Sequence, residues 1–174
     1  MIWVTEFRSP IGVLKLATRE EQLCLLTPVD RWTRARAHLA RRSPDDAWRH
    51  ADDPGGVVSS LRRYFDGEVW VLDDIDVELS GSPFQRRAWQ AMRAIPPGTT
   101  DSYRSLAANL GSPRGIRAVG SAAGNNPIGL VVPCHRVVRS DGGLGGYGWG
   151  LQPKRWLLEH EKTSVKSNAT AGQP

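Results

Sequence analysis

The sequence predicts an α/β protein (α+β) in which a small N-terminal α/β domain, residues 1–80, precedes a mainly helical C-terminal domain, residues 81–162. Three observations support this prediction. The first 27 residues place apolar runs around a tight turn, a pattern typical of antiparallel strands. From residue 82 onward, capping signals and helical periodicity replace that pattern. A chain of 174 residues is also long enough for one compact domain or for two small ones.

The N-terminal half contains strand and helix signals in a regular order. Ser9-Pro10-Ile11-Gly12 has proline and glycine at positions that favour a turn between two strands. Cys24 lies among leucines, so we interpret it as a core residue rather than a reactive one. No catalytic group of residues is evident in this half. The predicted elements are strands at 2–8, 12–18 and Gln22–Thr27, a helix at 30–42, a loop at Ser43–Gly56, a helix at Val57–Phe65 and a strand at Val69–Leu79.

The C-terminal half begins with a strong helix signal. Ser82-Pro83-Phe84-Gln85 combines an N-cap serine, a proline at the first helical position and a glutamine that completes a capping box. Ser102 can cap a helix from Tyr103 to Leu110, and Ser112-Pro113 begins another that runs to about Ala123. Two helices joined by so short a turn fit a helix–turn–helix, although a generic helical hairpin gives the same pattern.

The second of these helices has three different faces. A helix with its side chains is ~10–12 Å across and the DNA minor groove is only ~6 Å wide, so a face without side chains favours close approach to a widened groove. Packing against another helix is the alternative explanation. The apolar face is Ile116, Val119 and Ala123, the polar face is Arg114, Arg117 and Ser121, and the face of small residues is Gly115, Ala118 and Ala122.

Charge is distributed unevenly along the chain. The net charge is +5, but residues 1–80 hold 11 Arg/Lys against 14 Asp/Glu, whereas residues 81–174 hold 12 against 4. This segregation predicts that the C-terminal half binds a polyanion, namely nucleic acid. The sequence shows no membrane span or export signal, and its two cysteines fit a reducing compartment, so we expect a cytoplasmic protein. The spacing of histidines and cysteines predicts no metal site.

The stretch Val131–Val138 holds the strongest candidate for chemistry. Four valines surround Pro133, Cys134, His135 and Arg136, and the positive charge beside the cysteine favours its thiolate form. The alternative is that Cys134 is a small buried hydrophobic residue. We predict a buried strand at Ile128–Val132, a pocket wall in the glycine-dense segment Ser140–Gly150, a last helix at Pro153–Glu161 and a disordered tail at 163–174.

The motif Pro-Cys-His-Arg-Val at 133–137 resembles the active-site signature of the O6-alkylguanine-DNA alkyltransferases, and the similarity runs from about Ser82 to Glu161. The resemblance implies a winged-helix-like C-terminal domain that binds double-stranded DNA through the minor groove as a monomer. It also implies that an O6-alkylated guanine is flipped out and loses its alkyl group irreversibly to Cys134, without a cofactor or a metal. O4-alkylthymine is a further candidate substrate.

The resemblance also implies roles for individual residues. Glu161 orients His135, which takes the proton of Cys134 through a water molecule, and Glu159 is a weaker alternative to Glu161. Trp149 is expected to narrow the pocket against bulky adducts. The implied catalytic residues are Cys134, His135, Glu161 and Asn126. The implied substrate contacts are Tyr103, Val137, Tyr147, Gly148, Trp149 and Lys154, and the implied DNA contacts are Tyr103, Arg114, Gly115, Arg117, Ala118, Ser121 and Ala122.

Two other classes of protein remain as alternatives. A cysteine hydrolase would use the same thiol and imidazole but would need an oxyanion hole, and it would leave the basic helix unexplained. A helix–turn–helix protein that only binds DNA would explain the basic helix, but it would have no use for a reactive Cys134. Transfer of an alkyl group to the protein would distinguish the three classes.

Overall fold

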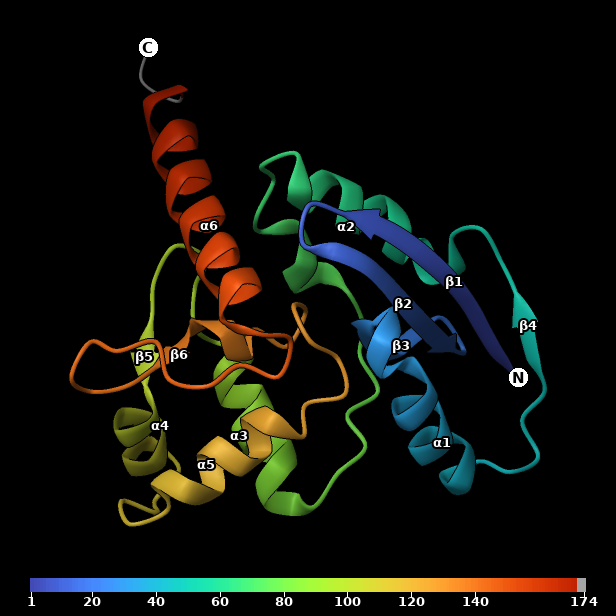
Figure 1. The fold of residues 1–174 in the computed structure, drawn as a ribbon, viewed down its shortest axis with the longest axis horizontal. Helices are drawn as coiled ribbons and strands as arrows, with labels where there is room; N and C mark the ends of the chain where they lie inside the picture. The colour runs from blue at the N-terminus through green and yellow to red at the C-terminus, as the bar shows by residue number, and fades with distance from the viewer. Residues whose placement is uncertain (172–174) are drawn as a thin grey trace.

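A computed structural model of the protein describes residues 1–171 and places an N-terminal sheet beside a bundle of helices (Figure 1). The sheet has the strand order β3-β2-β1-β4. Strands β1 (Ile2–Ser9) and β2 (Gly12–Arg19) form a hairpin, and β3 (Gln22–Pro28) continues it in antiparallel fashion. The predicted turn is where the hairpin reverses, and Gly12 has φ +114°, a conformation that glycine adopts readily.

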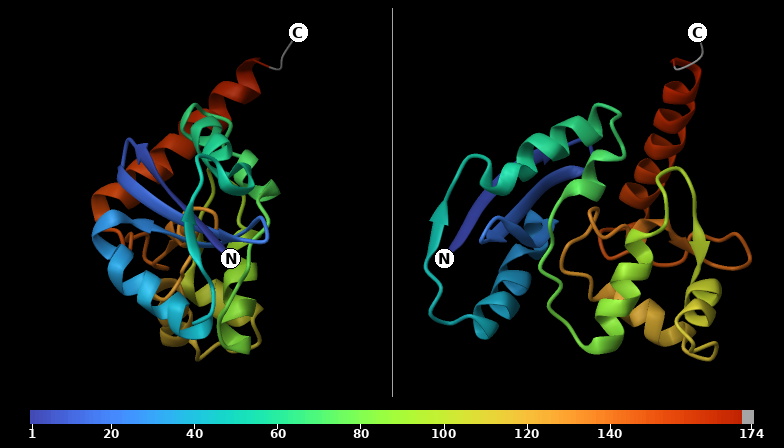
Figure 2. Two further views of the ribbon diagram at one scale, coloured as in Figure 1. Left: turned by 90° about the vertical axis from the view of Figure 1, so that its right-hand side faces the viewer. Right: turned by 180° about the vertical axis from the view of Figure 1, so that it is seen from behind.

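A helix covers each face of this sheet. On one face, α1 (Trp32–Arg42) packs through Leu39 against Ile2, Ala17 and Leu25. On the other face, α2 (Val57–Phe65) contributes to a core that continues without a break into the C-terminal half. Figure 2 shows the two helices on opposite sides of the strands.

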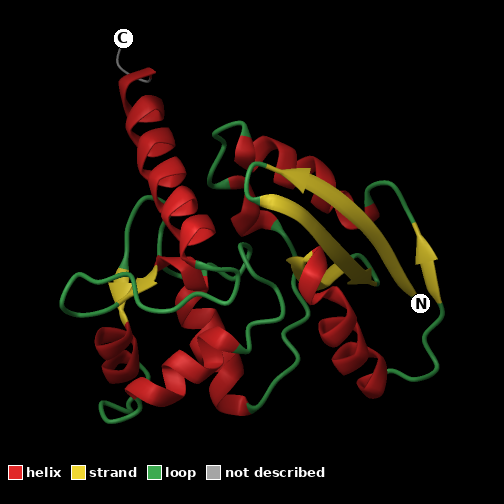
Figure 3. Cartoon of the chain, viewed as in Figure 1, coloured by secondary structure: helices red, strands yellow, loops and turns green. Residues whose placement is uncertain are grey.

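The C-terminal half consists of four helices and a two-stranded ladder (Figure 3). The capping box predicted at Ser82 and Gln85 is present at the start of α3. The ladder pairs β5 with β6 in parallel, which brings the start of α4 beside the turn that holds Cys134. The elements are α3 (Pro83–Arg93), β5 (Asp101–Ser102), α4 (Tyr103–Asn109), α5 (Ile116–Gly124), a 3-10 turn η4 (Cys134–Arg136), β6 (Val137–Val138) and α6 (Leu151–Ala171).

The fold class is as predicted, but several elements differ. Of the predicted strand Val69–Leu79, residues Val71–Asp74 form the 3-10 helix η3, in which the adjacent residues Val71 and Leu72 are both buried, unlike neighbours in a strand with one buried face. Only Val77 pairs, in an isolated parallel bridge to Leu23. The predicted strand Ile128–Val132 forms only isolated bridges. The predicted loop at 43–56 contains a short strand, β4 (Trp48–His50), parallel to β1, and a 3-10 turn, η2 (Pro54–Gly56).

The C-terminal segment also differs from its prediction. The sequence predicts disorder over 163–174, but α6 continues to Ala171, and residues 172–174 lie outside the described part of the chain. The extension is supported by packing, since the side chain of Val165 lies against Gly98 and Asn168 donates to the carbonyl of Gly67. Within residues 1–171, no helix is long and apolar enough to cross a membrane.

Candidate active site

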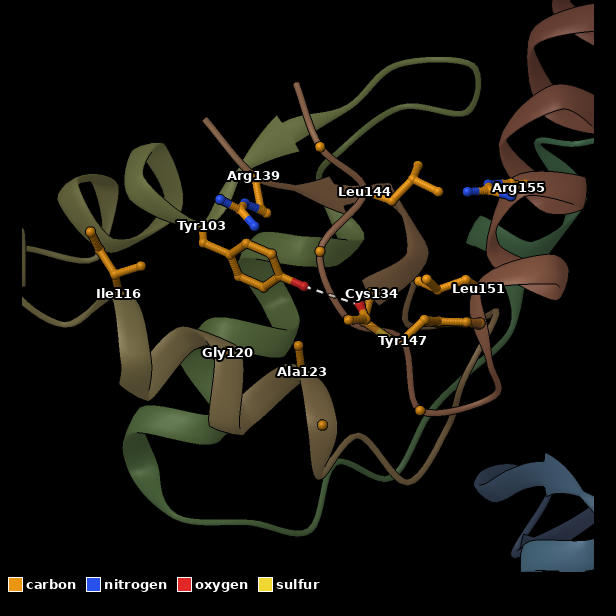
Figure 4. A pocket seen from close by; sticks show the side chains of 15 residues that line it. Tyr103, Ile116, Gly120, Ala123, Cys134, Arg139, Leu144, Tyr147, Leu151 and Arg155 are labelled. Atoms are coloured by element: carbon orange, nitrogen blue, oxygen red, sulfur yellow. Dashed lines mark hydrogen bonds between the residues drawn. The ribbon is translucent and has the colours of Figure 1, made fainter. Parts of the chain in front are cut away.

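Cys134 lines an open pocket with a volume of about 760 Å³ and is itself only 7% exposed. The walls come from the start of α4, from α5 and from the segment between β6 and α6. Figure 4 shows the phenol ring of Tyr103 pointing toward Cys134, with Ala123 of α5 below the end of the ring in this view. The other lining residues are Ile116, Gly120, Gly124, Arg139, Gly143, Leu144, Gly145, Gly146, Tyr147, Gly148, Leu151 and Arg155.

A single 3-10 turn positions Cys134, and Asn126 holds this turn from the end of α5. The amide of Asn126 donates to the carbonyl of Val132 at 2.8 Å and to Sγ of Cys134 at 3.2 Å. Its Oδ1 accepts from the backbone N–H of Ile128 at 3.0 Å. The side chain of Asn126 therefore joins the helix–turn–helix to the cysteine turn.

His135 and Glu161 form a fully buried pair behind the pocket. Nε2 of His135 lies 2.8 Å from Oε1 of Glu161. A carboxylate only accepts hydrogen bonds, so Nε2 carries the proton and Nδ1 is left as a free base. Nδ1 is buried and has no hydrogen-bond partner among the described residues. Glu159, the weaker alternative to Glu161, is exposed to solvent.

Glu161 receives further hydrogen bonds from Arg136 and Tyr64. Nε and Nη2 of Arg136 donate to the two carboxylate oxygens at 3.0 Å each, and the hydroxyl of Tyr64 donates to Oε1 at 2.8 Å. Burial raises the pKa of Glu161, but the hydrogen bond from His135 and the charge and hydrogen bonds of Arg136 outweigh burial and hold the pKa well below its usual range. Glu161 is therefore ionised at neutral pH.

The thiol of Cys134 is protonated in the resting protein. Burial raises its pKa, and the hydrogen bond from Asn126 and the charge of Lys154 oppose this effect only in part. The prediction that Arg136 favours the thiolate is wrong, because its guanidinium is turned to Glu161 and to the carbonyl of Ile95, 2.6 Å from Nη1. Burial lowers the pKa of His135, so this imidazole is a neutral base beside a neutral thiol.

Lys154 connects the glycine-dense segment to the strand after the cysteine turn through hydrogen bonds. Its Nζ donates to the carbonyls of Val137 at 2.7 Å, of Gly146 at 3.2 Å and of Leu144. Burial lowers the pKa of Lys154 to about 8. The hydroxyl of Tyr103 donates to the same Gly146 carbonyl at 3.4 Å (Figure 4). Lys154 thus supports the pocket wall from behind, and it is not among the residues that line the pocket, where the resemblance implied a substrate contact.

Trp149 does not line the pocket. Its ring lies against the backbone of Gly129, where a Cβ added to the glycine would come within 2.1 Å of the indole. The absence of a side chain at Gly129 creates the space that the indole fills. The wall is formed instead by Tyr147, whose ring centre is 5.8 Å from that of Trp149, and by Gly148. The predicted placement of Trp149 in the pocket is therefore wrong.

The faces of α5 are rotated relative to the prediction. Ala122 is buried, and its carbonyl accepts from Nε1 of Trp89 at 2.8 Å, so this side faces the core. Ile116 is 36% exposed and lines the pocket instead of the core. Gly115 precedes the helix as its N-cap. The small residues that face the pocket are Gly120, Ala123 and Gly124, whereas Arg114, Arg117, Ala118 and Ser121 are exposed, consistent with a surface available to DNA.

Tyr64 is a residue of the site that the sequence did not indicate. It lies on α2 in the N-terminal half, 97 positions before Glu161, and no motif links the two. Arg139, Leu151 and Arg155 were also not predicted as pocket residues. Their positions in an irregular loop and at the start of α6 carry no recognisable pattern.

Comparison with known proteins assigns both halves of the chain to one family. The family model for the 6-O-methylguanine DNA methyltransferase ribonuclease-like domain matches residues 2–79, and the model for the DNA binding domain of the same proteins matches residues 83–163. A methylated-DNA–protein-cysteine methyltransferase of Mycobacterium bovis is 40% identical over 174 residues, which cover 98% of each chain. One from Salmonella typhimurium is 52% identical over 111 residues, which span 64% of this chain and 65% of that relative.

A solved structure shares the fold. The crystal structure of Mycobacterium tuberculosis OGT in complex with DNA has a TM-score of 0.77 at 39% identity, with 93% of this chain and 94% of that chain covered. The family indicated by the motif at 133–137 is confirmed. The chain therefore belongs to the 6-O-methylguanine DNA methyltransferase family.

Proposed function

We propose that this protein repairs DNA by moving the alkyl group of an O6-alkylguanine to Sγ of its own Cys134. The observation that carries the proposal is a thiol at the wall of an open pocket, backed by the buried pair His135–Glu161. Family membership and the names of the relatives, which are methyltransferases acting on methylated DNA, support the same reaction. Each molecule acts once, because water does not displace the Cys134 thiolate from the alkyl carbon of the resulting thioether.

In the proposed step, a sulfur–carbon bond forms as the carbon–oxygen bond to O6 breaks. The proton of Cys134 passes through a water molecule to Nδ1 of His135, and then to the departing guanine. The raised pKa of the thiol makes such a base necessary, and the lowered pKa of His135 keeps it unprotonated until it is needed. Glu161 stabilises the imidazolium that forms meanwhile.

The pocket offers partners for a flipped purine. The hydroxyl of Tyr147 is buried and has no hydrogen-bond partner among the described residues, so it is free to bind the base. The carbonyls of Cys134 and Val137 accept from its amino group in our proposal. The ring of Tyr103 lies at the pocket wall beside Gly145, where it can crowd the neighbouring phosphate and turn the nucleotide inward.

We also propose that α5 docks in the minor groove. Gly120, Ala123 and Gly124 leave its pocket side nearly without side chains, and Arg117 is exposed one turn before Gly120. Arg117 would fill the gap left by the flipped base. The basic C-terminal half and the relative solved in complex with DNA support this interaction.

The test is the intact mass of the protein after mixing with a duplex that contains O6-methylguanine. We expect a stable gain of one methyl group, located at Cys134 by peptide mapping, with one lesion repaired per molecule. Cys134→Ser should lose transfer and keep its affinity for the duplex, since phosphate contacts supply most of the binding. Repeated turnover, or a methyl group on another residue, would contradict the proposal.

A further inference from the structure

Tyr64 connects the N-terminal half to the proposed proton relay. Its hydroxyl donates to Oε1 of Glu161 at 2.8 Å, and the same oxygen accepts from Nε2 of His135, also at 2.8 Å. All three side chains are completely buried. One carboxylate oxygen is therefore shared between the base and a tyrosine from the other half of the chain.

The position of Tyr64 is fixed from several sides. Its backbone carbonyl lies 2.8 Å from Nε2 of His160, and its ring packs edge-on against His160 and Phe65. Burial, and then the nearby charge of Glu161, raise the pKa of the Tyr64 phenol well above its ordinary value. The hydroxyl is consequently a neutral donor at neutral pH.

We propose that Tyr64 is a positioning residue of the alkyl-transfer site. Through Tyr64, the N-terminal half sets the strength of the hydrogen bond between Glu161 and the imidazole of His135. The inference rests on the proposed function. Oε1 also accepts from Nη2 of Arg136 at 3.0 Å, and Tyr64 is a further donor that shares the electron density this oxygen offers to Nε2. The hydrogen bond from His135 is therefore weaker than it would be without Tyr64. A hydrogen bond of moderate strength between His135 and Glu161 matters because the imidazolium must later give its proton to the departing guanine.

The effect of removing the Tyr64 hydroxyl can be separated from the effect of changing a charge. Replacing Tyr64 by phenylalanine changes no formal charge, so a change in His135 would come from the altered hydrogen bonding of Glu161. With one donor fewer, Glu161 would stabilise the imidazolium more strongly and His135 would stay protonated to higher pH. The titratable and charged groups around the imidazole are Tyr64, Cys134, Arg136, Tyr147, Lys154 and Glu161.

The experiment compares the full-length parent protein with Tyr64→Phe and with Phe65→Leu. Phe65 packs against the Tyr64 ring and against Trp156 of α6 but makes no hydrogen bond to Glu161, so its variant controls for lost packing around Tyr64 and between the two halves while the Tyr64 hydroxyl is retained. Two quantities are measured: the proton NMR resonance of Nε2–H of His135, assigned with His135→Gln, and the rate of methyl transfer as a function of pH.

For Tyr64→Phe we expect the Nε2–H resonance to move to lower field and the acid limb of the rate profile to move to higher pH. The rate at neutral pH should fall about tenfold, less than the ~10²–10⁴-fold that a general base contributes. Phe65→Leu should lower the melting temperature and leave both the resonance and the limb in place. The inference would be overturned if Tyr64→Phe left the Nε2–H resonance and the acid limb of the rate profile unchanged. It would also be overturned if Phe65→Leu shifted both by the same amount. If the parent transfers no methyl group, the proposed function fails, and the resonance still decides the role of Tyr64.

Discussion

Arg136 and Glu161 form an ion pair from which water is excluded. The guanidinium is 2% exposed and the carboxylate is completely buried. Arg136 makes two hydrogen bonds to Glu161 and one to the carbonyl of Ile95, which anchors the cysteine turn to the segment after α3. A buried pair of this kind adds little stability compared with an apolar pair, but loss of one partner leaves an uncompensated buried charge.

Glu161→Gln should therefore destabilise the protein by about 3–5 kcal/mol, because the charge of Arg136 loses its counterion. It should also change the pH dependence. The pKa of Glu161 is lower in the folded protein than the ~4.3 of an unfolded chain, so protons bind preferentially to the unfolded state. The stabilisation is present above about pH 5 and is lost as the pH falls.

Urea unfolding of the parent and of Glu161→Gln across pH 3–7 measures both effects. We expect the difference in the free energy of unfolding to be largest near pH 7 and to shrink toward pH 3. A difference that does not vary with pH would show that Glu161 is not ionised in the folded protein.

Sequence reasoning located most individual residues of the site but not their electrostatics. Cys134, His135, Asn126 and Glu161 come together as expected, because the motif and the family resemblance specify them. The expectation that the charge of Arg136 favours the thiolate of Cys134 was wrong, since the direction in which Arg136 points depends on folding. The contact with Tyr64 joins two distant segments and has no local signal.

At the scale of elements, the helices with capping signals were predicted best. The predicted helix at 57–65 agrees with α2, and the capping box begins α3. The short elements were not predicted, because a strand of two or three residues such as β4 or β6 is defined by its partner rather than by its own pattern. The division of the chain at residue 80 stays a prediction.

The rotation of α5 shows why its faces were misassigned. The core side is set by Val119 and Ala122 against Trp89, a contact that periodicity alone does not reveal. Ile116, an apolar residue, is thereby left at the pocket, beside Gly120. Arg117 nevertheless remains on the exposed surface.

Arg117→Ala should slow repair of a duplex by roughly 10- to 100-fold, because extruding the base costs a few kcal/mol that the arginine helps to offset. Reaction with free O6-methylguanine needs no extrusion and should be nearly unchanged. Arg114→Ala is the matched control, since Arg114 is exposed in the turn before α5. It should weaken duplex binding and its salt dependence without a comparable loss of rate at saturating DNA. If Arg117→Ala slowed the reaction with the free base and with the duplex equally, Arg117 would be a residue of the pocket or of the folded core instead.

The contact between Gly129 and Trp149 joins the segment before Cys134 to the glycine-dense loop. A Cβ at Gly129 would lie 2.1 Å from the indole, so Gly129→Ala should displace Trp149 and destabilise the protein by about 1–3 kcal/mol. Gly120→Ala is the control, because nothing lies within 4 Å of its Cβ position and alanine favours a helix. Thermal unfolding should show a lower melting temperature for the first variant and not for the second. If both variants melt like the parent, the indole is not packed on Gly129.

At the scale of the whole molecule, one continuous core joins the two halves. It extends from Leu14 and Leu16 of the sheet, through Tyr64 and Trp89, to Cys134. The proposed reaction therefore alters a side chain of the core and not only the surface of a pocket. Any strain at Cys134 is expected to affect the stability of the entire fold, because such a core unfolds cooperatively.

The methylated protein should consequently melt at a lower temperature than the unreacted one. A methyl group added to a buried sulfur overfills its surroundings, which costs about 1–3 kcal/mol, and it weakens the hydrogen bond from Asn126. For a chain of this size each kcal/mol lowers the melting temperature by about 2–4 °C. The measurement is differential scanning calorimetry of the reacted protein after removal of DNA, with Cys134→Ser carried through the same treatment as a control. The parent should lose several degrees while the control is unchanged. An unchanged or higher melting temperature of the methylated protein would show that the turn at Cys134 has room for the methyl group.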